Sequence, residues 1–232
     1  ATKLHVFKPG DKLRFGAFKV SSFGVNHSIP DAVSCVIDTP LGRVVHTGDF
    51  KFDKTPYAQK PADLNIIKNV GRQGVLAMIS DSTNSLVPGH TTSEKVIAQN
   101  LDKLVRDTKG RIIVASFSSL IGRLQQVMDA AVRYNRKVFI SGRSMITNVK
   151  IAQNLGYIKV PQGVIIDIKK MKKYKDHEII ALTTGSQGEN FAALARIATD
   201  NHAHVRIRKG DTVILSSSPI IGNEPAIIKV IN

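Results

Sequence analysis

The chain has 232 residues, a formal net charge of +15 and a pI near 10.0. This length can bury a hydrophobic core, and no apolar run approaches the roughly 20 residues that cross a bilayer, so we expect a globular protein without a membrane anchor. Cys35 is the single cysteine, which excludes a disulfide framework or thiolate zinc cluster and favours the cytoplasm. The excess of Lys and Arg predicts a polyanionic partner, unless it only solvates the surface.

The first part of the chain, from Lys3 to Thr47, alternates short β-prone runs with Pro-Gly, Gly and Asp turns. It predicts part of an antiparallel sheet, with strands at Leu4–Phe7, Lys19–Phe23, Val33–Ile37 and Val44–Thr47. Pro56, Pro61 and Gly71 interrupt any regular pattern after Phe50. We therefore place a domain boundary there, which divides the chain into residues 1–72 and 73–232.

The remainder of the chain, from Gly74, alternates apolar strands with helical segments. The strands are expected at Val75–Ser80, Ile112–Ser116, Lys137–Ser141, Ile179–Thr183 and Thr212–Ser216. The helices are expected at Ser93–Asp107, Leu120–Tyr134, Ser144–Leu155, Glu189–Thr199 and Asn223–Val230. Alternation of this kind predicts the α/β class, with a parallel, doubly wound sheet.

Small hydroxyl residues and glycines follow these strands. Ligands of open parallel sheets lie beyond the carboxyl ends of the strands, near helix N-termini that attract anions. We expect Asp81 and Ser216 at this edge, beside a phosphate- or RNA-binding set: Ser116, Ser118, Ser119, Arg123, Ser141, Arg143, Thr184, Gly185, Ser186, Gln187, Gly188 and Ser217. The alternative is that the hydroxyl residues are ordinary helix N-caps.

Two residues of the first part have the chemistry of metal ligands. His27 and Asp49 each follow a predicted strand. Imidazole nitrogen and carboxylate oxygen at neighbouring strand ends suit zinc or manganese, and such sites generate hydroxide at neutral pH. The alternative is structural, since Asp49 can also brace a turn.

Longer stretches resemble one family. The sequences around His27 (Val-Asn-His-Ser-Ile-Pro-Asp) and Asp49 (His-Thr-Gly-Asp-Phe-Lys) resemble the third and fourth metal motifs of ribonuclease J. Ser-Asp-Ser-Thr-Asn around Asp81 resembles its first β-CASP motif. Further similar stretches are Ile113–Ser118, Ser141–Met145, Leu182–Glu189 and Ile214–Pro219. Because the similarity extends nearly end to end, the chain is identified as a member of this β-CASP group of metallo-β-lactamase-type ribonucleases.

The resemblance implies a metallo-β-lactamase αββα core, represented by its sheet in residues 1–72, and a β-CASP domain in residues 73–232. It implies a two-metal centre, with zinc or else manganese or magnesium, and cleavage of single-stranded RNA as an endonuclease and as a 5′-to-3′ exonuclease favouring a 5′-monophosphate. His27 would bind one metal, Asp49 would bridge both, and Asp81 would hold the active site together. A homodimer or homotetramer is implied for the whole enzyme.

Several motifs of that family are absent from the sequence. Nothing before His27 matches its His-x-His-x-Asp-His loop. Its later catalytic histidine, in a Ser-Gly-His context, and its final metal-binding histidine also have no counterpart. His202-Ala203-His204 is expected to be a surface loop. We therefore expect a truncated part of an enzyme, rather than a naturally shortened relative, that retains no metal, is inactive alone and only binds RNA.

Two other functions remain open. The Gly185–Gly188 loop after a strand is also typical of a Rossmann-like nucleotide-binding protein, although no Gly-x-Gly-x-x-Gly follows the first strand. The chain could instead be an RNA-binding scaffold without catalysis. Metal analysis together with an RNA-degradation assay distinguishes these functions.

Overall fold

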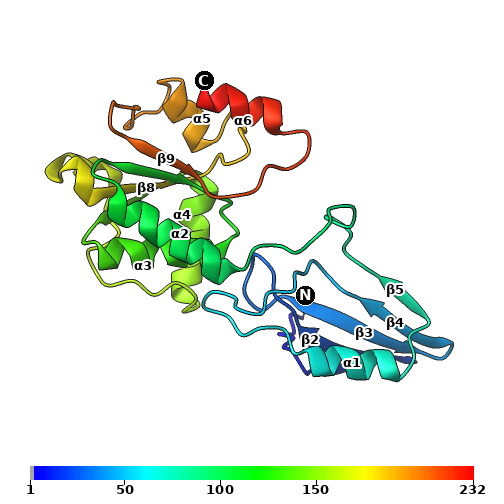
Figure 1. Ribbon diagram of the computed structural model, residues 1–232. Helices are drawn as coiled ribbons and strands as arrows, with labels where there is room; N and C mark the ends of the chain where they lie inside the picture. Colours follow the sequence, from blue (N-terminus) through cyan, green and yellow to red (C-terminus); the bar gives the residue numbers. More distant parts are fainter. Residues whose placement is uncertain (1–2) are drawn as a thin grey trace. The chain divides into compact units, whose positions relative to one another are not determined.

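The computed structural model describes residues 3–232, which form two compact units (Figure 1). One unit extends to Ile97 and the other begins at Ala98, and each has a sheet of its own. The division falls later than the boundary expected after residue 72. The physical reason is that β5 (Ala77–Ile79), expected in the parallel sheet, pairs instead with the last strand of the first sheet.

The first sheet has the strand order β1-β2-β3-β4-β5. The first four strands are antiparallel, and their bounds are Lys12–Phe15, Phe18–Gly24, Val33–Thr39 and Gly42–His46. The strand expected at Leu4–Phe7 does not form, and Leu4 is 90% exposed. Pairing begins only at Lys12, after the turn at Gly10. The first sheet is therefore antiparallel as predicted, with β5 as an added parallel strand.

One face of the first sheet is covered by α1 (Leu64–Arg72), which the sequence analysis did not predict. Phe23, Val36 and Val45 pack there against Ile67 and Val70. The Asp63 side chain accepts a hydrogen bond from the Asn65 N–H and caps the helix. Pro61 precedes this cap and Gly71 lies in the last turn, so neither interrupts the helix.

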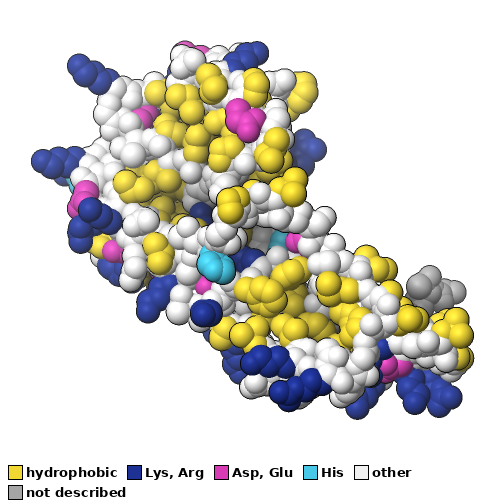
Figure 2. All heavy atoms as spheres, turned by 45° about the vertical axis from the view of Figure 1, so that its right-hand side comes forward, with side chains coloured by type: hydrophobic (Ala, Val, Ile, Leu, Met, Phe, Trp, Pro, Cys, Tyr) yellow, Lys and Arg dark blue, Asp and Glu magenta, His cyan; other side chains and the backbone are white. Residues whose placement is uncertain are grey.

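The opposite face of the first sheet is apolar and open. The strand register brings Val20, Ile37 and Val44 into one row across it, with Cys35 and Ile79 in the next row. None of these five side chains is buried. Apolar side chains also gather on the surface of the first unit in Figure 2. Within the described part of the chain, no helix covers this face, and the segment around Lys8 covers Ser22 at one side of it.

The second sheet has the strand order β7-β8-β6-β9, and all its strands are parallel. In chain order the strands are β6 (Ile112–Ala115), β7 (Lys137–Ser141), β8 (Ile179–Thr183) and β9 (Thr212–Leu215). β6 and β8 are central and entirely buried, which accounts for their uninterrupted apolar sequence. The predicted parallel α/β sheet is confirmed.

Helices cover both faces of the second sheet (Figure 1). Ile112 and Val114 point into an apolar cluster with α2 (Glu94–Asp107), α3 (Ile121–Arg133) and α4 (Arg143–Asn154). Ile113 and Ala115 point the other way, into a cluster with α5 (Ala193–Ala198), α6 (Glu224–Ile231) and the 3-10 helix η1 (Ile168–Lys173). A second 3-10 helix, η2 (Asp176–Glu178), leads into β8. Neither η1 nor η2 was predicted from the sequence, and α5 is shorter than expected.

A buried ion pair joins the starts of β6 and β9. The Arg111 guanidinium donates to both carboxylate oxygens of Asp211, at 3.1 and 2.5 Å, and to the Arg206 carbonyl at 2.6 Å. The Arg111 and Asp211 side chains are 1% and 4% exposed. This fork fixes the register of two neighbouring parallel strands at one edge of the sheet.

No helix within residues 3–232 combines the length and the apolar character that crossing a membrane requires.

Candidate functional site

His27 and Asp49 lie close together in the first unit. His27 follows the end of β2, and Asp49 follows the end of β4. Their Nε2 and Oδ2 atoms are 3.6 Å apart. Asp49 is largely exposed and His27 is half-buried, so both side chains remain accessible to a ligand. Both residues therefore lie beyond the ends of strands that neighbour β3 in the sheet, as expected from the sequence.

Asp81, after β5, holds the loop that carries Asp49. Its carboxylate accepts hydrogen bonds from the Thr83 hydroxyl and N–H, and a longer one of 3.5 Å from the Phe50 N–H. Its own N–H donates to the Thr47 hydroxyl at 3.0 Å. The Thr83 hydroxyl and N–H lower the pKa of Asp81, burial opposes them, and His27 adds a smaller lowering effect. The ionised Asp81 therefore contacts the chain on both sides of Asp49, at Thr47 and at Phe50, and holds this loop in place.

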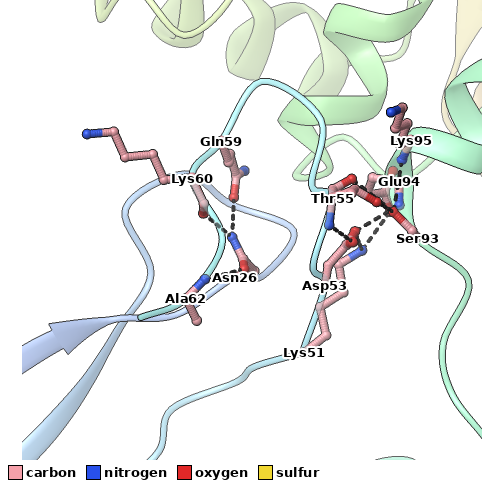
Figure 3. A network of polar contacts seen from close by, with 10 residues as sticks. All are labelled: Asn26, Lys51, Asp53, Thr55, Gln59, Lys60, Ala62, Ser93, Glu94 and Lys95. Atoms are coloured by element: carbon pink, nitrogen blue, oxygen red, sulfur yellow. Dashed lines mark hydrogen bonds and ion pairs between the residues drawn. The ribbon is translucent and has the colours of Figure 1, made fainter. Parts of the chain in front are cut away.

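Asn26 fixes the base of the His27 loop, and the sequence analysis missed it (Figure 3). Its buried side-chain amide donates to the Lys60 carbonyl at 2.8 Å and accepts from the Ala62 N–H at 3.0 Å. Asn26 also bridges to Lys51 through the backbone. Because Asn26 directly precedes His27, these hydrogen bonds fix the backbone position from which the His27 side chain extends. The only feature of the sequence that points to Asn26 is its position next to His27.

The residues present fit a metal only in part. Imidazole and carboxylate are suitable donors, but closed zinc sites use about four protein ligands and open ones about three. Within residues 3–232, no group of three or more His, Cys, Asp or Glu side chains is arranged to hold a metal. His46 does not join the pair, because its Nδ1 accepts the Gly48 N–H at 3.1 Å. His27 and Asp49 thus form a half-site that is insufficient for a dinuclear centre.

Next to this half-site, Asp53 organises the start of α2 (Figure 3). Its buried carboxylate accepts hydrogen bonds from the N–H groups of Thr55 and Glu94, at 2.9 and 2.8 Å. Lys51 donates to the Glu94 carboxylate at 2.7 Å and lies 3.9 Å from Asp53. Asp53 therefore serves as an N-cap from a distant part of the chain.

The Asp53 network predicts a pH-dependent contribution to stability. Burial raises the pKa of Asp53, but hydrogen bonds from Glu94, Ser93 and Thr55 and the charge of Lys51 outweigh it, so the pKa lies below 3.8. The ionised carboxylate therefore stabilises the fold above pH ~4, and this contribution is lost as the pH falls through the lowered pKa. Asp53→Asn should cost about 1–3 kcal/mol at neutral pH. Urea titrations of both proteins should show the difference shrinking in acid; a constant difference would contradict the assignment.

In the second unit, all four strands deliver their carboxyl ends to one edge. Ser116, Ser141, Thr184 and Ser216 lie there, each at or just after the end of its strand. Their predicted common edge is confirmed. The expectation that Asp81 shares this edge is wrong, because β5 belongs to the other sheet.

Several residues of the predicted phosphate-binding set are used within the protein. The Arg123 guanidinium is buried and donates to the Ser216 carbonyl and hydroxyl, at 3.0 and 2.5 Å. Ser141 Oγ lies 2.8 Å from His202 Nε2. The Ser116 and Ser186 hydroxyls are buried and have no hydrogen-bond partner within residues 3–232. Arg123 and Ser141 therefore organise the strand ends, whereas the Ser116 and Ser186 hydroxyls make no such contact within the described residues.

The expected surface loop at His202-Ala203-His204 requires a correction. His204 is exposed, but His202 is buried. Its Nδ1 accepts the N–H groups of His204 and Val205, so its Nε2 carries the proton and donates to Ser141. Burial, followed by the charges of Arg196 and His204, lowers the pKa of His202 and favours this neutral form. His202 thus fixes the end of β7.

The Gly185–Gly188 loop after β8 packs tightly. The Gln187 amide donates to the Ser217 hydroxyl at 2.9 Å and the Ser218 carbonyl at 3.0 Å, and accepts the Ile220 N–H at 2.8 Å. Gly188 has φ +74°, and a Cβ there would lie 2.3 Å from the Ala226 carbonyl carbon. Only glycine permits this approach to α6. Gln187 therefore clamps the loops after β8 and β9 together.

A smaller part of the predicted set stays accessible. Ser119 and Arg143 are exposed, and Ser118, Thr184 and Ser217 are half-buried. Arg143 is the first residue of α4, and a helix N-terminus favours anions. Of the predicted set, these five residues are accessible, while Arg123, Ser141 and Gln187 hold the strand ends through buried hydrogen bonds.

Comparison with known proteins identifies the family. Residues 109–232 match the family model described as the β-CASP domain of ribonuclease J. The chain belongs to the ribonuclease J family. Ribonuclease J of Corynebacterium glutamicum is 48% identical over 94% of this chain, and that of Thermus thermophilus is 45% identical over all of it. Ribonuclease J 1 of Streptococcus pyogenes is 48% identical over 95% of this chain.

The chain corresponds to only part of the length of these relatives. It spans 30% of the Corynebacterium glutamicum protein, 39% of the Streptococcus pyogenes protein and 40% of the Thermus thermophilus protein. A crystal structure of a protein of unknown function from Enterococcus faecalis has a similar fold. Its TM-score is 0.58 at 13% identity, covering 92% of this chain and 57% of that one. The family-model match over residues 109–232 contains all four strands of the second sheet and assigns that sheet to the β-CASP domain.

Proposed function

We propose that this chain is the RNA-handling part of a metal-dependent ribonuclease that hydrolyses single-stranded RNA in the cytoplasm. Membership of the ribonuclease J family supports the reaction, and the net charge of +15 suits a polyanionic substrate. The observation that carries the proposal is the 3.6 Å approach of His27 to Asp49 beside Asp81. These are metal-ligand donors at the ends of neighbouring strands.

In the proposed centre, which needs ligands beyond this pair, His27 would hold one metal and Asp49 would be a ligand shared by two, with zinc, manganese or magnesium as the cation. A metal bound there would supply a hydroxide at neutral pH. Within this chain, Asp81 keeps the Asp49 loop in place and Asn26 sets the position of His27. The half-site geometry supports the further proposal that residues 1–232 alone bind RNA but do not cleave it.

The carboxyl edge of the second sheet is the proposed binding surface for the RNA backbone. Arg143 and Ser119 are its exposed donors, and the strand ends behind them are fixed by buried hydrogen bonds. A preference for a 5′-monophosphate, 5′-to-3′ exonuclease action beside endonuclease action, and a homodimer or homotetramer belong to the same proposal. A fixed edge with a helix N-terminus at Arg143 suits a terminal phosphate.

RNA binding by the 232-residue chain tests the proposal. A labelled single-stranded oligoribonucleotide should bind with an affinity that falls steeply with salt, by about 0.7 log units per log unit of salt for each phosphate contact. Fluorescence anisotropy between about 50 and 200 mM salt measures this slope. Incubation of the RNA with zinc or manganese should leave it intact. Binding insensitive to salt would contradict the electrostatic argument, and cleavage after removal of contaminating nucleases would contradict the half-site.

A further inference from the structure

A strip of lysines lies at the amino-terminal edge of the second sheet, opposite the edge that carries Ser141 and Thr184. Five of the seven residues from 169 to 175 are lysines, in and just after η1. η2 follows and leads directly into the start of β8. We call Lys169, Lys170, Lys172, Lys173 and Lys175 the lysine strip. All five side chains are exposed.

The fold turns the lysine strip outward. Ile168, Met171 and Tyr174 recur every third residue, and all three pack into the apolar cluster on one face of the sheet. A 3-10 helix has three residues per turn, so these side chains form one inward row. The lysines between them must therefore point into solvent. The segment is anchored by its apolar row, and its charges add nothing to the core.

The charges of the lysine strip are not neutralised by the protein. No ion pair involves any of these five ammonium groups within residues 3–232. The nearby carboxylates are directed elsewhere. Asp167 and Glu178 accept the backbone N–H groups of Lys169 and Lys175, and Asp176 lies 3.7 Å from Arg208. The strip is a concentrated positive charge without a protein partner.

A hollow of about 400 Å³ extends the same positive edge, with His177 on its wall two residues beyond the strip. Its other walls include Arg106, Lys109 and Arg136. Arg136 is 5% exposed, and within residues 3–232 it donates only to main-chain carbonyls, those of Val105, Thr108 and Gly110. These carbonyls lie at the end of α2, where a cation is favoured. No carboxylate within the described residues pairs with this guanidinium.

We propose that the lysine strip is a second RNA-binding surface, which holds the phosphodiester backbone of the strand without reading its bases. The inference rests on RNA being the ligand of this chain. Exposed, unpaired ammonium groups on flexible stems suit sequence-independent phosphate contacts. Since β8 has five residues and a strand rises about 3.3 Å per residue, the two edges are separated by roughly 15 Å. Only an RNA longer than a few nucleotides reaches both.

Substitution of four lysines tests the proposal in the 232-residue chain. Lys169→Gln, Lys170→Gln, Lys172→Gln and Lys173→Gln together remove four charges and keep the length of the stems. Binding of a long oligouridylate with a 5′-hydroxyl end should weaken at least tenfold at low salt, and the salt slope should fall by up to about 3, at about 0.7 per lost contact. The matched control removes four exposed charges of the first unit: Lys12→Gln, Lys19→Gln, Lys60→Gln and Lys68→Gln.

The outcomes separate this inference from the proposed function. If the wild-type chain does not bind the oligouridylate, RNA binding itself fails. If the wild type binds but both quadruple variants weaken it equally, only the lysine strip is rejected. Polyglutamate serves as a probe for an acidic protein partner. If the quadruple variant of the lysine strip loses polyglutamate binding but retains RNA binding, the strip is rejected as an RNA-binding surface in favour of an acidic protein partner. Circular dichroism checks folding. If the quadruple variant does not fold, the double variant Lys170→Gln and Lys173→Gln, which changes one side of η1, replaces it. Its affinity for the oligouridylate should fall at least threefold.

Discussion

Asp49→Ala, made in a ribonuclease J chain of the relatives' full length, is expected to abolish metal-dependent RNA cleavage. Asp49 lies 3.6 Å from His27, and its exposed carboxylate is free to bind cations. Loss of an outer-shell partner of a metal ligand already costs about 10- to 100-fold, so loss of a proposed bridging ligand should cost more. The measurement is the cleavage rate of single-stranded RNA at saturating metal, together with the metal content of the purified protein.

A matched variant excludes a general effect of removing a carboxylate. Asp11→Ala removes an acidic side chain of the same unit that accepts the Lys8 N–H in a turn. The cleavage rate of this variant should stay near that of the wild type. RNA binding should survive in both variants, because the proposed phosphate contacts lie elsewhere. Full activity and full metal content in Asp49→Ala would remove Asp49 from the centre.

Asp211→Ala should produce the largest loss of stability, about 3–5 kcal/mol, because it leaves the Arg111 guanidinium as an uncompensated buried charge. Arg111 is 1% exposed and retains only the Arg206 carbonyl as a partner in that variant. The register of β6 against β9 also loses its clamp. The free energy of unfolding from urea titration measures the effect.

An exposed pair provides the comparison for Asp211. Arg106 and Asp107 form a salt bridge of 2.9 Å with both side chains more than half exposed. Asp107→Ala should leave the urea midpoint unchanged, because exposed ion pairs contribute little. A second comparison is the double replacement of Arg111 and Asp211 by apolar residues of similar volume, which should recover much of the lost stability. Equal effects of Asp211→Ala and Asp107→Ala would contradict the role of burial.

The sequence predicted the second sheet well because each of its strands is a short apolar run followed by a helix. That local pattern is sufficient for a parallel sheet, in which neighbouring strands lie far apart in sequence. It did not predict which sheet receives β5, since Ala77–Ile79 is equally apolar in either position. The choice depends on pairing with β4, which is a tertiary interaction. α1 was missed because two prolines and a glycine were given more weight than Asp63 and the apolar spacing of Leu64, Ile67 and Val70.

The candidate site was predictable in residue type but not in accessibility. His27 and Asp49 could be placed together because both follow strands that neighbour β3 in the sheet. Whether a polar side chain at a strand end faces solvent or another side chain depends on distant partners. Arg123 finds Ser216 and Ser141 finds His202, separated by 93 and 61 residues in the sequence. The sequence shows that lysines are frequent between residues 169 and 175, but not which way they point. Their outward direction became clear only from the 3-10 geometry of η1.

The open apolar face of the first sheet has a practical consequence for work with this chain in solution. Val20, Ile37 and Val44 present a surface on which two copies can stack, and hydrophobic contact is little affected by added salt. Repulsion between copies that each carry +15 opposes such stacking, but it is screened beyond about 10 Å at 0.1 M ionic strength. The chain should therefore stay dispersed in dilute buffer and self-associate as salt rises. Salt titrations of RNA binding consequently need light scattering alongside them, so that loss of free protein is not counted as loss of affinity.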